Sequence, residues 1–258
     1  MRQTWVPLAI LCLLGAGTAT AMSMGQLSVT PDLSVPPLHH FRIDLGGLFE
    51  SSISSLKSGL EGDLYGPYLS ISYGAASNAV LTVDGMAYKT FAPQHGAEGS
   101  SGPGDFAVWG KFLLGQDDRR DRAYGVRFGA KLPNTPSNKD FGTNRTDFFM
   151  HVFGGLARGP WEFDGYGGLG ILERPGEPAS QDDVAMVGLL VKRAVASGSV
   201  RVEVEGFTKS QLYGDNWALH VTYEHRFGPT WGAVIGGQLS KGRFYGSGEG
   251  RVGLVFWL

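Results

Sequence analysis

Residues 199–209, SVRVEVEGFTK, alternate strictly between apolar and charged side chains. Because successive side chains of a β-strand point to opposite faces, the valines share one face and most of the charged residues share the other. In a soluble β-protein the valines would face an apolar core and the charges would face water. In a membrane barrel the valines would face lipid and the charges would face an aqueous lumen. The rest of the chain decides between these two folds.

The same alternation recurs in segments of about ten residues, each followed by turn residues, which is typical of membrane strands. The pattern predicts roughly twelve strands. No convincing amphipathic helix follows Ala21, although residues 51–60 would allow a helical turn or two inside a loop. The predicted strands cover 41–50, 67–74, 79–91, 104–114, 123–132, 146–157, 161–172, 183–194, 199–209, 217–227, 231–241 and 251–258.

The connections between these strands alternate in length. Short ones are predicted at 75–78, 116–121, 158–160, 196–199 and 228–230, and longer ones at 51–66, 92–103, 133–145, 173–182, 210–216 and 242–248. Short periplasmic turns and longer extracellular loops are typical of outer-membrane barrels with an even number of strands. A soluble β-sandwich has no reason to sort its loops in this way. The sequence therefore predicts an all-β fold, an antiparallel transmembrane β-barrel with lipid outside and water inside.

The N-terminus has the pattern of a secretory signal peptide. Arg2 precedes an apolar run from Val6 to Leu14 that is too short to span a bilayer, and small residues at 19–21 mark a cleavage site. We predict a signal peptide at 1–21, an N-terminal periplasmic segment at 22–40 and the barrel at 41–258. The segment 22–37 has no strand pattern, so we favour a disordered tail over the alternative that it enters the lumen.

Composition limits the chemistry. The only cysteine, Cys12, leaves with the signal peptide, so we expect no disulfide, thiol chemistry or cysteine metal site. The 40 glycines, 12% aromatic and 18% charged residues are typical of outer-membrane barrels of Gram-negative bacteria, and the net charge of −2 argues against nucleic-acid binding. We expect no cofactor and no bound metal. The expected partners are outer-membrane lipid, lipopolysaccharide, the barrel-assembly machinery and a small-molecule cargo.

Aromatic residues support the membrane interpretation. Several lie on the apolar face near predicted strand ends, where amphipathic rings prefer the headgroup level of a bilayer. They are Tyr124, Phe148, Trp161, Trp217, Tyr223, Phe227, Trp231 and Phe256.

The opposite face of the strands predicts a lumen lined by charges of both signs. This lining indicates either a polar permeation path or a salt-bridged plug. Since about eight strands leave a filled interior and about sixteen leave an aqueous channel, twelve favour a narrow, partly obstructed path. The predicted lumen residues are Arg42, Asp44, Arg127, Lys131, His151, Glu162, Asp164, Arg201, Glu203, Glu205, His220, Glu224, Gln238 and Arg251.

One region resembles a known family. The stretches GPGDFAVWGKFLLG (102–115) and YGVRFGAKLPNTPSNKDFGTNRTDFF (124–149) resemble the "MetA-pathway of phenol degradation" family of outer-membrane transporters. The shared motifs are Gly104-Asp105, Gly110-Lys111-Phe112, Lys131-Leu132-Pro133 and a loop from Gly142 to Asp147. Here Asn134-Thr135 follows Lys-Leu-Pro where the family has Thr-Gly, and Asn144-Arg145 replaces Gly-Ser. The resemblance implies a barrel that passes aromatic or other small compounds.

Three functions remain open at this point. The first is a channel or transporter for small, hydrophobic or aromatic, compounds. The second is a closed barrel with a structural or surface-interaction role. The third is a lipid hydrolase, which needs a nucleophile beside a base. His151 and His220 are predicted to face inward, and His225 lies beside a short periplasmic turn, so we expect no enzymatic activity. We interpret His39 and His40 as a polar lead-in to the first strand rather than a metal site, because adjacent residues of a strand face opposite ways.

Overall fold

The alternating segments form antiparallel strands. The structure, a computed structural model, describes residues 33–54, 60–94, 96, 98–117, 121–136, 139, 141, 145–173, 181–210, 214–242 and 246–258. The predicted signal peptide and residues 22–32 lie outside this part of the chain. The described residues contain no helix that is long and apolar enough to cross a membrane.

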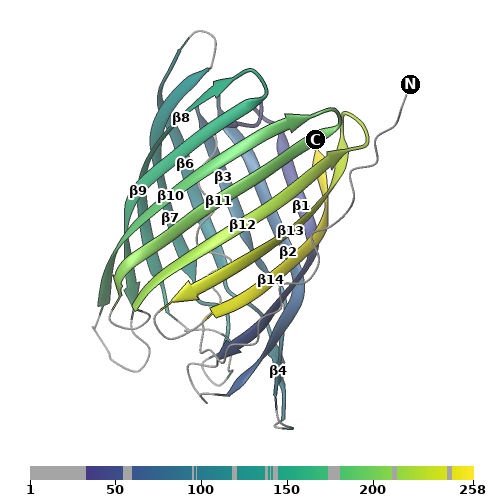
Figure 1. Cartoon of the computed structure of the whole chain (residues 1–258), viewed down its shortest axis with the longest axis vertical. Helices are drawn as coiled ribbons and strands as arrows, with labels where there is room; N and C mark the ends of the chain where they lie inside the picture. Colours follow the sequence, from purple (N-terminus) through teal and green to yellow (C-terminus); the bar gives the residue numbers. More distant parts are fainter. Residues whose placement is uncertain are drawn as a thin grey trace.

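Twelve of the described strands form a closed barrel (Figure 1). Each pairs antiparallel with its neighbours in chain order, and β1 closes the sheet by pairing with both β2 and β14. The prediction of an antiparallel barrel of about twelve strands is confirmed. The strands are β1 (Phe41–Ser54), β2 (Glu61–Ala76), β3 (Ala79–Met86), β6 (Phe106–Gln116), β7 (Arg122–Leu132), β8 (Asp147–Arg158), β9 (Trp161–Glu173), β10 (Gln181–Val195), β11 (Gly198–Ser210), β12 (Gly214–Arg226), β13 (Trp231–Gly242) and β14 (Gly246–Trp257).

Two short strands extend the sheet beyond the barrel. β4 (Lys89–Pro93) and β5 (Ser100–Gly102) continue β3 and β6 in the same register, and β4 also pairs with the start of β2. The label β4 marks this extension at the bottom of Figure 1. The predicted strand 79–91 is therefore interrupted after Met86. The facing chain carries Pro103 there, which has no backbone N–H to donate to the ladder.

Short connections gather at one end of the barrel, here called the turn end. They are 77–78, 117–121, 159–160, 196–197 and 227–230. At the other end, the loop end, two connections predicted to be long span only residues 211–213 and 243–245. They are shorter because strand pairing continues to Ser210 with Gly214 and to Lys241 with Gly246. Residues 51–54 are also strand rather than a helical turn, because β1 resumes pairing with β2 after a bulge.

The two faces of the barrel wall differ in the predicted way. Val200, Val202 and Val204 are exposed on the outside, whereas Glu203 and Glu205 are buried inside. Large apolar side chains cover the outer face of every barrel strand, as a lipid-facing band requires. The predicted aromatics lie on this outer surface, and at the turn end Phe227 packs on Trp231 with ring centroids 4.5 Å apart.

Residues 33–37, here called the N-terminal strap, lie inside the mouth of the barrel at the turn end. The Leu33 amide donates a hydrogen bond to Glu162 on β9, at 3.2 Å, and the Lys111 ammonium on β6 donates to the Ser34 carbonyl. Leu33 and Val35 pack against the apolar cluster inside the barrel. Since β9 stands opposite β1 in the strand order, the strap crosses the mouth. For these five residues, the structure therefore favours the alternative that the segment enters the lumen over a disordered tail.

Candidate functional site

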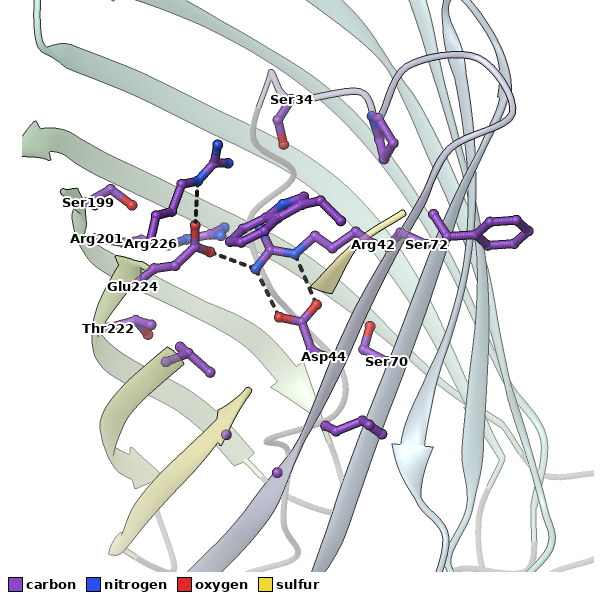
Figure 2. A pocket seen from close by; sticks show the side chains of 18 of the residues that line it. Ser34, Arg42, Asp44, Ser70, Ser72, Ser199, Arg201, Thr222, Glu224 and Arg226 are labelled. Carbon is purple, nitrogen blue, oxygen red and sulfur yellow. Dashed lines mark hydrogen bonds and ion pairs between the residues drawn. The ribbon is translucent and has the colours of Figure 1, made fainter. Parts of the chain in front are cut away.

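The inner face of the barrel encloses a cavity of about 1330 Å³ at the turn end. Its lining includes the strap, the turns at 196–197 and 228–230, and inward side chains from all twelve strands except β8 and β9. Figure 2 shows part of this cavity from close by. We call it the vestibule. It is a water-accessible part of the lumen.

Cationic side chains outnumber anionic ones in the vestibule, although the whole chain has a net charge of −2. Seven lysines and arginines line it (Arg42, Lys111, Arg127, Lys192, Arg201, Arg226 and Arg251), against three carboxylates (Asp44, Asp84 and Glu224).

Buried charges outside the vestibule show the opposite balance. Among the described residues they comprise seven carboxylates (Glu50, Asp105, Asp147, Asp164, Asp182, Glu203 and Glu205) and two lysines (Lys89 and Lys131). The interior is therefore divided into a basic, open compartment and an acidic, buried one.

A cluster of ion pairs occupies one wall of the vestibule (Figure 2). Arg42 donates hydrogen bonds to Asp44 at 2.9 and 3.0 Å and to Glu224 at 2.8 Å. Arg226 lies 3.8 Å from Glu224, and its guanidinium carbon is 4.2 Å from the centre of the Trp257 ring. The Arg226 side chain is 54% exposed, whereas that of Glu224 is 15% exposed. The cations in this cluster therefore face the water more than the carboxylates do.

Strands β9 to β11 repeat this arrangement. Lys192 contacts Glu162 at 3.1 Å, and Arg201 lies 3.6 Å from Glu203. In both pairs the cation is the more exposed partner. Each carboxylate pairs with a cation from a more buried position, so the cationic group lies at the surface of the vestibule.

A stack of rings lies behind the vestibule residue Arg127, on the wall that β6 to β9 form. The Arg127 guanidinium lies 3.8 Å from the centre of the Trp109 ring. Behind it, His151 lies 5.9 Å from Trp109 and 4.5 Å from Tyr166, measured between ring centroids. All three rings are buried, and they come from β6, β8 and β9. The stack fills part of the interior on this side of the barrel.

The loop-end part of the interior is filled by side chains. Phe91 and Phe207 are almost completely buried. Charged groups there form pairs, among them Lys131 with Asp147 at 2.5 Å and His220 with Glu205 at 2.8 Å. The lumen is thus open at the turn end and obstructed toward the loop end.

The fourteen predicted lumen residues all lie on the inner face, in two groups. Six line the vestibule, namely Arg42, Asp44, Arg127, Arg201, Glu224 and Arg251. The others lie beneath its surface or in the filled part of the interior, namely Lys131, His151, Glu162, Asp164, Glu203, Glu205, His220 and Gln238.

Sequence reasoning missed several vestibule residues. Lys111, Lys192 and Arg226 have the inward parity of their predicted strands, so alternation alone could have found them. Trp109 and Trp257 were missed because an aromatic residue in a membrane strand is ordinarily read as lipid-facing. Both rings lie on the inside, with the same strand parity as Lys111 and Arg251, so alternation alone could have placed them too.

The histidines considered for catalysis have other partners. His220 pairs with Glu205, and the Nδ1 atom of His225 lies 2.9 Å from the Tyr223 hydroxyl. His151 lies between two aromatic rings. None of these contacts places a serine beside a base. Within the described part of the chain, no three His, Cys, Asp or Glu side chains are grouped to hold a metal ion.

The closed barrel with an apolar exterior and a charged lumen defines a transmembrane β-barrel of the outer-membrane type. The chain is similar in structure to an outer-membrane channel from Pseudomonas putida F1, with a TM-score of 0.67 and 12% identity over 90% of this chain and 100% of that chain. It is also similar to the NanC porin, with a TM-score of 0.60 and 14% identity over 83% of this chain and 98% of that chain. The translocator domain of the autotransporter NalP from Neisseria meningitidis gives a TM-score of 0.55 at 12% identity, over 87% and 90% of the two chains.

At these identities the likeness establishes the fold, which the chain shares with outer-membrane channels and porins. No protein-family model matches the chain, and no curated protein sequence matches it.

Proposed function

We propose that the protein is a channel of the bacterial outer membrane that passes small molecules through its lumen. The observation that carries the proposal is a water-accessible, charge-lined vestibule inside a barrel with an apolar exterior. A barrel that served only as an anchor would have its interior filled with side chains, as the loop-end part of this one is. Open space lined by charged groups is instead what a polar permeation path requires.

The proposal includes an orientation. The turn end faces the periplasm and the loop end faces the cell exterior, because outer-membrane barrels have short periplasmic turns and longer external loops. The apolar outer band then contacts membrane lipid, and the loop end lies among lipopolysaccharide. Insertion depends on the barrel-assembly machinery.

The packed rings of Trp109, His151 and Tyr166 narrow the lumen on the side of β6 to β9, and buried side chains fill it toward the loop end. The channel is therefore narrow and partly obstructed rather than a wide pore. This fits a barrel of twelve strands, which lies between a filled interior and an open aqueous channel.

The cargo proposed from sequence motifs is a small, hydrophobic or aromatic compound. The motif Gly110-Lys111-Phe112 lies in β6 with Lys111 in the vestibule, and Lys131 ends the inner face of β7. Residues 142–144 of the loop motif lie outside the described residues. The resemblance to the phenol-degradation transporter family supports this cargo class.

Uptake by liposomes tests the channel. The refolded protein is reconstituted, its folded state is checked by heat-modifiable migration on a gel, and the influx of small sugars, ions and phenolic compounds is measured. Influx faster than in protein-free liposomes, with a preference among the solutes, is expected. Influx equal to that of protein-free liposomes, with folded protein present, would overturn the proposal.

A closed structural barrel is the second candidate, and the filled loop-end interior favours it. Reversing Glu203 and Glu205 would not separate the two, because both side chains are buried and the change would lower stability in either case. Arg226 is a better test because its side chain is exposed to the vestibule. If the protein is a channel, Arg226→Glu should shift its ion selectivity. If the barrel is closed, the variant should have no conductance, like the unaltered protein.

A further inference from the structure

We infer that the vestibule binds small organic carboxylates. The inference names the substrate class of the proposed channel and rests on that function for its role in transport. Binding itself is a property of the vestibule, which is formed in the folded barrel whether or not solute crosses the barrel.

The cations of the vestibule are more exposed than the carboxylates that they pair with. Arg42 and Arg226 present guanidinium groups to the cavity, and their carboxylate partners Asp44 and Glu224 are less exposed in every pair. A solute that reaches this surface meets cations first. A concave site lined mainly by one sign of charge also focuses the electric field and concentrates counter-ions.

Arg226 has unused hydrogen-bonding capacity toward the cavity. A guanidinium has five N–H donors. Arg226 has only a long contact with Glu224, at 3.8 Å, and the face of Trp257 holds it in place. Its fork therefore remains available for a carboxylate, which arginine binds through two parallel hydrogen bonds.

Two of the three carboxylates that line the vestibule, Asp44 and Glu224, are already engaged by arginine. Both oxygens of Asp44 accept hydrogen bonds from Arg42, and Glu224 accepts a third. A cationic solute would have to displace these arginines. An anionic solute adds to the cluster without breaking it.

The lining also offers surface to the organic part of such a solute. Tyr68 and Trp257 line the same cavity, and the strap contributes Val35, Pro36 and Pro37. A carboxylate attached to a planar ring can then place its charge at Arg226 and its ring against these groups. Benzoate is a suitable probe.

The experiment is isothermal titration calorimetry of the detergent-solubilised, folded protein with benzoate and with benzamide, its neutral analogue of the same shape. Benzoate should bind more tightly than benzamide, and its affinity should fall as salt is raised, because exposed charge pairs are screened. Equal affinity for the two probes, or no binding of benzoate, would overturn the inference. This comparison uses only the unaltered protein.

Variants locate the site. Arg226→Gln should weaken benzoate binding about tenfold, the effect of losing one charged hydrogen-bonding partner, and Arg226→Glu should weaken it further. Arg158→Gln is the matched control, because it removes a cation from the exposed outer surface at the same end of the barrel. Equal losses in the Arg226 and Arg158 variants would contradict the assignment of the site. If an Arg226 variant fails to fold, Lys192→Gln replaces it, with the same expected direction.

Calorimetry and liposome influx separate this inference from the proposed function. Binding of benzoate without influx of any solute would reject the channel and leave the carboxylate site in place. If neutral solutes enter the liposomes but benzoate binds no more tightly than benzamide, the channel stands and the carboxylate site is rejected.

Discussion

The ion pair between Lys131 and Asp147 shows how single residues stabilise the filled part of the lumen. Both side chains are almost fully buried, and their charged atoms lie 2.5 Å apart. Breaking such a pair leaves a buried charge without its partner. Lys131→Met should therefore lower the free energy of unfolding by about 3–5 kcal/mol.

A double-mutant cycle tests this expectation, with urea unfolding in lipid vesicles as the measurement. Lys131→Met combined with Asp147→Leu should recover much of the stability lost in either single variant, because no charge is then left unpaired. Arg158→Gln, on the exposed surface, should change the unfolding midpoint little. Strictly additive losses at the two buried positions would show that the pair does not act as a unit.

Glycine and aromatic residues also act in pairs, which explains their abundance. Trp109 lies directly across from Gly129 in the strand register, and a Cβ atom at Gly129 would come within 2.0 Å of the Trp109 ring. The same relation joins Gly206 to Trp217 on the outer face. Composition reveals that both residue types are frequent. It does not reveal that an aromatic ring lies over a glycine of the neighbouring strand, because this pairing depends on the register between strands.

At the scale of elements, period-two alternation was sufficient to predict the barrel strands, because each wall residue faces either lipid or lumen. It was insufficient where backbone chemistry interrupts a strand, as at Pro103, and where strands extend past the membrane into short loops. The strap was not predictable from pattern, since its contacts with Glu162 and Lys111 span 129 and 77 residues of chain. The Arg42 cluster likewise joins residues 182 positions apart.

The strap leads to a prediction about an element. Leu33 and Val35 are its apolar contacts with the barrel interior. Leu33→Asp together with Val35→Asp should release the strap, because burying a carboxylate among apolar side chains is unfavourable by several kcal/mol. Limited proteolysis followed by mass spectrometry should then detect rapid cleavage between residues 33 and 40.

Leu38→Asp provides the control for this experiment, because Leu38 is exposed and should leave the cleavage rate unchanged. If the channel function holds, release of the strap should also accelerate influx into liposomes. Cleavage of the double variant at the rate of the unaltered protein would contradict the role of these two contacts.

At the scale of the whole molecule, the barrel has opposite polarity inside and outside, and the surrounding lipid makes this arrangement stable. Leu189 tests that statement, since it lies in the middle of β10 and is 69% exposed on the outer face. In a membrane, Leu189→Arg places a charge in hydrocarbon and should lower the free energy of unfolding by about 2–4 kcal/mol. In water, a surface substitution of this kind would change stability by about 0.5 kcal/mol or less.

Leu132→Arg is the matched change at the rim, because Leu132 is the last residue of β7 and also faces outward. Its effect should be about 0–1 kcal/mol, since charge is tolerated near the membrane interface. Urea titrations of both variants in lipid vesicles measure the difference. A large loss at position 189 with a small loss at 132 places the middle of β10 in hydrocarbon, whereas equal small effects would reject a lipid-facing band around the barrel.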